Sequence, residues 1–236
     1  MSNWQPLESN CEVINKYMNT IGLDTTDYTF QDLISLEDWA QNMVGRPVLG
    51  VLFTYEISPA QEAFRHQEEQ RLAPGGQVVP QNVFYMKQYA ENACGTIGCF
   101  HILGNLEDGH KHLLQTGSQL DSFFKQVQGK TPEQSGDIFE NDQEIKDKHI
   151  TATNEGDTNV ENHMNTCNHF IAFVLKDGHI IELDGRKNRL INHGPSTRDT
   201  FLPDACTIVQ GFMNRDPESL NVNTIVFAHN PAPEAD

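Results

Sequence analysis

Two apolar runs that flank a short polar turn constrain the fold of this chain more than any other feature. The runs cover His169–Leu175 and His179–Asp184, and Lys176-Asp177-Gly178 separates them. Asp-Gly is a preferred sequence for tight hairpin turns because both positions tolerate positive φ. The pattern therefore predicts an antiparallel β-hairpin, which Leu190-Ile191 extends into a meander.

Helical patterns alternate with strand-like runs along the rest of the chain. Apolar residues from Val13 to Ile21 recur at helical spacing and stop at Gly22, and Val48–Phe53 is an apolar run of strand length. The expected helices cover residues 7–23, 35–43, 60–72, 91–103, 119–128, 133–141 and 202–215, and the remaining strands 48–53 and 224–228. The chain is expected to be mixed α/β without internal repeats.

Length and composition favour one domain. The chain has 236 residues, 37% of them hydrophobic, which is enough for one substantial core. We expect a single domain over residues 1–230 and a short loose tail over 231–236.

The cysteines and the first residues favour a reducing compartment. Met1-Ser2-Asn3-Trp4 lacks a basic start and an apolar run, and no stretch has the length and apolarity needed to cross a bilayer. The five cysteines are odd in number and widely spread, so free thiols are expected. The expected location is the cytoplasm, with the nucleus as a second compartment and no membrane partner.

The charge balance restricts the class of partner. Sixteen basic and thirty-three acidic residues give a formal net charge of −17, which argues against a nucleic-acid partner. Charge alone leaves two interpretations open: solubility, and steering of a cationic protein substrate.

Cys94 is the first candidate for chemistry because it lies near the start of an expected helix. A thiol attacks an acyl carbon as the thiolate, and a helix N-terminus lowers the thiol pKa. Gly95 and Gly98 are expected to let the backbone approach a substrate closely. The alternative, a buried structural cysteine in a tightly packed helix, is the more common situation when Cys94 is taken by itself.

The expected hairpin makes His169 and Asp184 candidates for one site. His169 starts its first strand and Asp184 ends its second, so the turn brings the two residues near each other. Such a pair fits a general base and the carboxylate that orients it. An ordinary strand start and a simple turn are the alternatives for each residue alone, whereas the combination with Cys94 favours a catalytic triad.

Other kinds of site are weaker. Gly95-Thr96-Ile97-Gly98 lacks the lysine and the spacing of a phosphate loop. His110-Lys111-His112, and Cys94 with Cys99, lack the partner cluster of a zinc site. No cofactor and no metal is expected.

Two longer segments resemble the signatures of the ubiquitin C-terminal hydrolases, thiol proteases of the C12 peptidase type. Tyr85–Gly98 resembles the active-site signature, and the residues from His169 to Lys187 resemble the second one. The similarity covers nearly the whole chain and is nearest to the short, single-domain isozyme type. Further matches are Trp4, Pro6-Leu7-Glu8, Arg46-Pro47, Ile191-Asn192-His193-Gly194, Phe212-Met213 and Arg215-Asp216-Pro217.

The resemblance implies both a fold and catalytic roles. Cys94 matches the nucleophile, His169 the base and Asp184 the carboxylate, while Gln88 matches the side-chain donor of the oxyanion hole. A neutral amide suits that last role because it does not compete for the proton of the histidine. The implied fold is a papain-like core, α/β of the α+β kind, in which helices flank both sides of an antiparallel sheet and the backbone is knotted.

The resemblance also implies a substrate. The reaction is hydrolysis after the C-terminal glycine of ubiquitin, or of a related modifier, by a monomer. Substrate-binding positions carried over are Pro6, Leu7, Glu8, Asn92 and Asp157. Residues 150–167 match the crossover loop beneath which the substrate tail passes, so small or unfolded adducts are the expected leaving groups.

Two alternatives remain at this point. The chain could bind or stabilise ubiquitin with little turnover, or it could be a papain-like amidase or acyltransferase that acts on small molecules.

Overall fold

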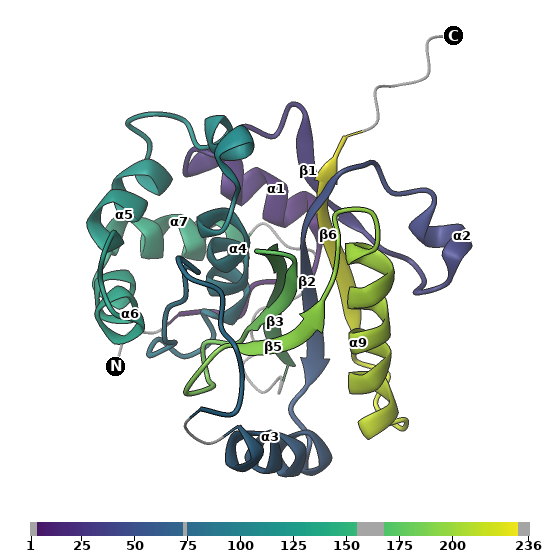
Figure 1. Ribbon diagram of the computed structural model, residues 1–236. Coiled ribbons are helices and arrows are strands. Elements are labelled where there is room, and N and C mark those ends of the chain that lie inside the picture. Colours follow the sequence, from purple (N-terminus) through teal and green to yellow (C-terminus); the bar gives the residue numbers. More distant parts are fainter. Residues whose placement is uncertain (1–3, 73–74, 155–167, 231–236) are drawn as a thin grey trace, which may run out of the picture.

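A central antiparallel sheet organises the computed structural model, which describes residues 4–72, 75–154 and 168–230 (Figure 1). Within these ranges the sheet has six strands in the order β1-β6-β2-β3-β4-β5. They are β1 (Tyr28–Asp32), β2 (Val48–Glu56), β3 (Asn168–Lys176), β4 (His179–Leu183), β5 (Ile191–Pro195) and β6 (Asn223–His229). The expected mixed fold with an antiparallel sheet is confirmed.

Helices cover both faces of the sheet (Figure 1). One face carries α1 (Cys11–Thr20), α4 (Cys94–Gly104), α5 (Gln119–Val127), α6 (Pro132–Glu140) and α7 (Gln143–Thr153), with the 3₁₀ helix η1 (Asp108–Leu113). The other carries α2 (Asp38–Gln41) and α9 (Phe201–Arg215), and α3 (Pro59–Arg71) packs against α9. The sheet is therefore a middle layer between two helical layers.

The central strands bury both of their faces. In β2, Leu52 belongs to the core on the α4 side, whereas Val51 and Phe53 belong to the core on the α9 side. In β3, Phe170 and Ile171 divide in the same way. Burial on both sides explains why these strands are continuous apolar runs rather than alternating ones.

The hairpin predicted from the sequence is present. Strands β3 and β4 pair antiparallel with Ala172 opposite Leu183, and Lys176 and His179 close the turn. Asp177 and Gly178 have φ of 49° and 74°, as a two-residue turn of the favoured hairpin type requires. This turn sets the register that brings His169 and Asp184 to the same end of the sheet.

Several expected boundaries were wrong. The first helix begins at Cys11 rather than Leu7 because the Asn10 side chain accepts hydrogen bonds from the amides of Glu12 and Val13. Residues 4–9 instead form an irregular segment. Strand β2 continues to Glu56, helix α2 is shorter than expected, and β1 and η1 were not predicted.

Part of the expected crossover loop is helical. Residues 150–153 form the last turn of α7, which begins after Asp142, whose side chain accepts from the amide of Ile145. Residues 155–167, including Asp157, lie outside the described residues. The knotted backbone, the single domain over residues 1–230 and the tail over 231–236 stay predictions.

Candidate active site

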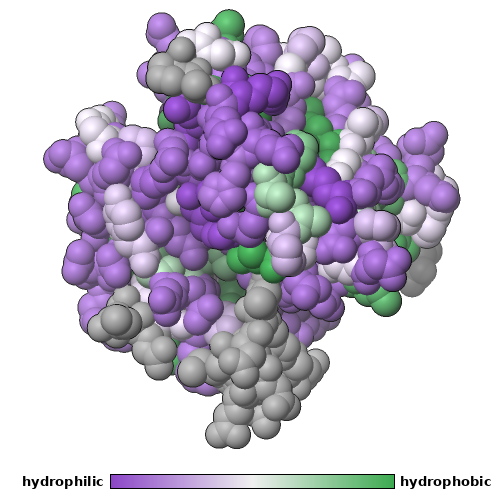
Figure 2. All heavy atoms as spheres, turned by 90° about the horizontal axis from the view of Figure 1, so that it is seen from below, coloured by the Kyte–Doolittle hydropathy of each residue, from purple (hydrophilic) through white to green (hydrophobic). Residues whose placement is uncertain are grey.

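Four segments from two distant parts of the sequence, residues 83–94 and residues 168–187, meet at one end of the sheet. They are the start of α4, the start of β3, the residues after β4, and the irregular segment 83–88. The lower end in Figure 1 is where β2 ends, and Figure 2 views this end directly. The face is largely hydrophilic, and hydrophobic side chains gather in a hollow near its centre (Figure 2).

Cys94 is the first residue of α4 and is only 8% exposed. Burial opposes ionisation of the thiol, but the hydrogen bond and the charge of His169 outweigh burial and lower the pKa of Cys94. The backbone amides of Phe170 and Gly95 act in the same direction. Ala93 provides no side-chain cap, so the amides of the first turn remain available to an anion.

His169 is buried between a thiol and a carboxylate. Its Nε2 donates to Oδ1 of Asp184 at 2.7 Å, which leaves Nδ1 as the nitrogen for the Cys94 sulfur. Burial disfavours the imidazolium, but the Asp184 charge and hydrogen bond prevail and raise the pKa of His169 to about 9. The ring also packs edge-on against Tyr55, with centroids 5.8 Å apart.

Asp184 is fully buried and is held by the loop that follows β4. Its Oδ1 also accepts from the amide of Arg186 at 2.9 Å. Burial raises the pKa of this carboxyl, but the charge of His169 and their hydrogen bond hold it far below the usual range. The carboxylate therefore stays ionised and holds the imidazole by a hydrogen bond, and its catalytic role stays a prediction.

Gln88 lies beside this loop in the irregular segment. Its amide N–H donates to the carbonyl of Gly185 at 2.9 Å, and its side-chain Nε2 donates to the carbonyl of Ala90 at 3.2 Å. The second N–H of the side-chain amide remains free to serve as an oxyanion donor.

Two further residues place Gln88 and were not found from the sequence. A Cβ on Gly185 would lie 2.9 Å from Cβ of Gln88, so only glycine permits this approach. The hydroxyl of Tyr85 lies 2.7 Å from the carbonyl oxygen of Asp184 and 2.6 Å from that of Lys187. Asp184 was predicted as the orienting carboxylate, but Gly185 was given no role of its own, although a glycine directly after such a carboxylate is a signal of close approach.

Gly95 and Gly98 do not face a substrate, so that expectation was wrong. A Cβ on Gly95 would lie 3.1 Å from Leu7, and one on Gly98 would lie 2.5 Å from Leu52. These glycines instead let α4 pack closely against the N-terminal segment and β2.

The expected substrate-binding residues differ in how deeply they are buried and in what they contact. Leu7 is buried against Gly95, whereas Pro6 and Glu8 are partly exposed. Asn92 has a φ of 62° and donates its side-chain amide to the carbonyl of Trp4 at 3.1 Å. Their substrate contacts stay predictions.

A buried histidine ties the N-terminal segment to α4. His149 Nε2 donates to the carbonyl of Gln5 at 2.6 Å, and its Nδ1 accepts from the hydroxyl of Thr96 at 2.8 Å. Burial lowers the pKa of His149 to about 4, against the opposing effect of the Gln5 carbonyl. The segment with Leu7 is thereby held against the catalytic helix.

Neither a metal centre nor a membrane span is found within residues 4–72, 75–154 and 168–230. No group of three or more acidic, histidine or cysteine side chains is arranged there to hold a metal ion. No helix in these ranges has the length and apolarity to cross a membrane.

Comparison with known proteins identifies relatives along the whole chain. The family model described as ubiquitin carboxyl-terminal hydrolase, family 1, matches residues 4–214. Ubiquitin carboxyl-terminal hydrolase 3 of Arabidopsis thaliana is 39% identical over 95% of this chain and 94% of its own length. The human isozyme L1 is 33% identical over 94% of this chain and 97% of its own length.

A solved structure supports the fold. The catalytic domain of Trichinella spiralis UCH37, crystallised with ubiquitin vinyl methyl ester, superposes with a TM-score of 0.75. The alignment covers 97% of this chain and 96% of that one at 18% identity.

Proposed function

This chain belongs to the ubiquitin carboxyl-terminal hydrolase family, and from that premise we propose that Cys94, His169, Asp184 and Gln88 perform its reaction. The protein is a cysteine-type hydrolase of the deubiquitinating class. The assignment rests on a chain of buried hydrogen bonds. Asp184 bonds His169, and His169 bonds Cys94 at the start of α4. This arrangement supports His169 as the general base, Asp184 as the carboxylate that orients it, and Cys94 as a nucleophile with a lowered pKa.

The geometry supports a two-step acyl transfer. The Cys94 thiolate attacks the carbonyl carbon of the terminal glycine, and the negative charge that develops on oxygen is stabilised by Gln88 and by amides of α4. His169 gives its proton to the leaving amine as the C–N bond breaks, which leaves a thioester. His169 then takes a proton from water, whose oxygen attacks the thioester and releases Cys94.

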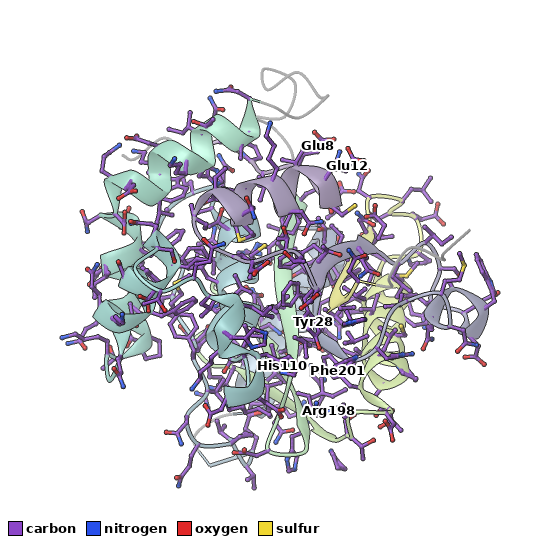
Figure 3. All side chains as sticks on the ribbon, turned by 90° about the horizontal axis from the view of Figure 1, so that it is seen from above. Glu8, Glu12, Tyr28, His110, Arg198 and Phe201 are labelled. Carbon is purple, nitrogen blue, oxygen red and sulfur yellow. The ribbon has the colours of Figure 1, made fainter. Side chains whose placement is uncertain are left out.

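An acidic groove supports the basic C-terminal tail of ubiquitin as the ligand. A cavity of about 610 Å³ is lined by Glu8, Glu12 and Asp32, among others. Glu8 and Glu12 lie together at the start of α1 (Figure 3). Leu7, which precedes Glu8 in the sequence, packs against Gly95, and Gly95 directly follows Cys94. Electrostatic attraction would guide a cationic tail along this groove.

The proposal extends to the leaving group. A crossover loop would admit thin adducts and exclude folded ones, so the protein should release small amines, thiols or peptide extensions. A ubiquitin fluorophore conjugate should be cleaved much faster than folded diubiquitin. Equal rates would contradict the size filter without affecting the triad. Activity on related modifiers, a monomeric state and a cytoplasmic location belong to the same proposal.

Release of a fluorophore from the ubiquitin C-terminus tests the central assignment. Wild-type protein should turn over, and Cys94→Ala should fall to background, whereas Cys99→Ala on the same helix should keep its activity. An electrophilic ubiquitin probe should label Cys94, located by mass spectrometry. Retained activity in Cys94→Ala would refute the nucleophile. Tight ubiquitin binding without turnover or labelling would instead support a ubiquitin-binding protein.

A further inference from the structure

A second large cavity lies away from the triad. Its volume is about 640 Å³, and segment 82–85, the C-terminal half of α4 and helix α5 form its walls. Small-molecule sites typically enclose about 300–1,000 Å³. The apolar side chains that line the cavity include Val83, Phe84, Leu103, Leu114, Phe124 and Val127.

The apolar wall contains aromatic surface that the core does not cover completely. Phe84 and Phe124 are only partly buried, although both pack against the main core. Their rings meet edge to face with centroids 5.3 Å apart. Such a wall can accept an acyl chain or a flat ring and remove it from water.

The polar lining is cationic in a strongly acidic protein. Among the described residues, Lys111, Lys125 and Lys130 line the cavity, and Asp121 is the single acidic lining residue. Lys125 pairs with Asp121 at 2.7 Å, and Lys111 pairs with Asp108 at 2.6 Å. Exposed pairs of this kind contribute little free energy, so the ammonium groups can turn toward another anion. The charge is opposite to that of the groove formed by Glu8, Glu12 and Asp32.

We propose that this cavity binds an amphiphilic carboxylate, with its apolar body against Phe84 and Phe124 and its carboxylate at Lys125 and Lys130. The apolar wall supplies burial, and the lysines select an anionic head group. The basic tail proposed for the catalytic groove is disfavoured here by like charge.

The cavity shares a wall with the segment that carries Gln88. Phe84 and Tyr85 line the cavity, and the Tyr85 hydroxyl contacts the carbonyls of Asp184 and Lys187. Pro132 also lines it, and its carbonyl accepts from the amide of Lys87 at 3.0 Å. A bound carboxylate therefore contacts residues that position Gln88, and a change in turnover follows. The change in turnover rests on the proposed function, whereas binding of the carboxylate to the cavity does not.

Fluorescence titration tests the binding site without requiring turnover. The probe is 8-anilinonaphthalene-1-sulfonate, which should bind the folded wild-type protein saturably and be displaced by palmitate below its micellar concentration. The uncharged analogue N-phenyl-1-naphthylamine should bind at least tenfold more weakly. Lack of saturable binding, failure of palmitate to compete, or equal affinity for the uncharged analogue would overturn the proposal.

Variants locate the site. Lys125→Glu combined with Lys130→Glu should weaken probe binding at least tenfold, and Val83→Trp should reduce it by filling the cavity. Lys148→Glu, on the exposed side of α7, is the matched charge control and should bind as wild type. Circular dichroism and thermal unfolding identify variants that remain folded. Wild-type affinity in both folded cavity variants would overturn the assignment.

Steady-state kinetics test the connection to Gln88. Saturating palmitate should change kcat for fluorophore release at least twofold in the wild-type protein and leave the double lysine variant unchanged. An unchanged kcat with palmitate bound would overturn the connection to Gln88. An inactive wild-type protein that still binds palmitate would refute the proposed function instead.

Discussion

The first turn of α4 and the turn that follows it each hold a buried cysteine, and the pKa values of the two thiols shift in opposite directions. Cys94 and Cys99 lie on this helix and are both buried. His169 and nearby amides lower the pKa of Cys94, whereas burial without a cationic partner raises that of Cys99. Burial therefore makes a thiol inert unless a cation and amide donors are built around it.

Two of the buried histidines, His169 and His149, differ in the same way. His169 hydrogen-bonds Cys94 and has a pKa raised to about 9, whereas His149 hydrogen-bonds Thr96, two residues further along α4, and has a pKa lowered to about 4. His169 has the Asp184 carboxylate as its partner, and His149 has a carbonyl and a hydroxyl. A buried carboxylate thus separates a catalytic imidazole from a structural one.

Removing the Asp184 carboxylate should lower kcat more than any other change considered below. Asp184→Asn keeps the side-chain volume but removes the charge that stabilises the imidazolium, so His169 should become neutral, as His149 is. We expect kcat to fall by about four orders of magnitude, as in other triads. Turnover of a ubiquitin fluorophore conjugate and NMR titration of His169 measure both effects. A wild-type kcat in a folded variant would contradict the role of Asp184.

Removing the oxyanion donor should have a smaller effect. Gln88→Ala should lower kcat by about two to three orders of magnitude with little change in KM, because the donor acts mainly in the transition state. Gln81→Ala, an exposed residue just before segment 83–88, is the control and should keep wild-type kinetics. An effect on KM alone would show that Gln88 binds ground-state substrate instead.

The pH dependence should show both halves of the catalytic pair. Activity should rise as Cys94 ionises below the ordinary thiol value of 9.0 and should fall as His169 loses its proton near pH 9. The two limbs belong to the coupled pair rather than to separate residues. In Asp184→Asn the alkaline limb should move to lower pH. A flat profile across the neutral range would count against the pair.

The structural histidine should affect stability rather than chemistry. The pKa of His149 is about 4 in the folded protein and about 6.5 when unfolded, so unfolding takes up a proton between these values. Stability contributed by neutral His149 is present above pH 6.5 and falls by about 2 kcal/mol at pH 5. His169 has the opposite sign: its contribution is complete below pH 6.5 and is lost as pH rises through about 9.

Substitution of His149 separates these two contributions. His149→Gln can still donate to Gln5 but loses packing with Trp4, so we expect a loss of about 1–3 kcal/mol at pH 7. The decrease in stability from pH 7 to pH 5 should become smaller, while the alkaline limb of activity stays in place. Denaturant unfolding at both pH values measures this. A shifted alkaline limb would show that His149 acts on the catalytic pair.

Local patterns were sufficient for the elements that carry the triad. The Asp177-Gly178 turn predicted the hairpin, and Cys94 was correctly expected near the start of its helix, although that helix begins at Cys94 rather than at residue 91. Both depend on neighbours in sequence. The helix starts after Asn10 and Asp142 were missed, although side-chain caps mark them. Strand β1 was missed because its identity depends on pairing with β6 at the far end of the chain.

The sequence by itself determined which residues could do the chemistry, through the hairpin pattern and the family signatures. Only the tertiary structure decided which of them become reactive. Cys94 and Cys99 lie five residues apart on one helix, and the charge of His169 lowers the pKa of Cys94 whereas no charged group offsets the burial of Cys99. Likewise, Gly95 and Gly98 suggested an open approach to substrate until Leu7 and Leu52 were found to fill that space. Electrostatics and packing act through space between distant segments, so local sequence cannot specify them.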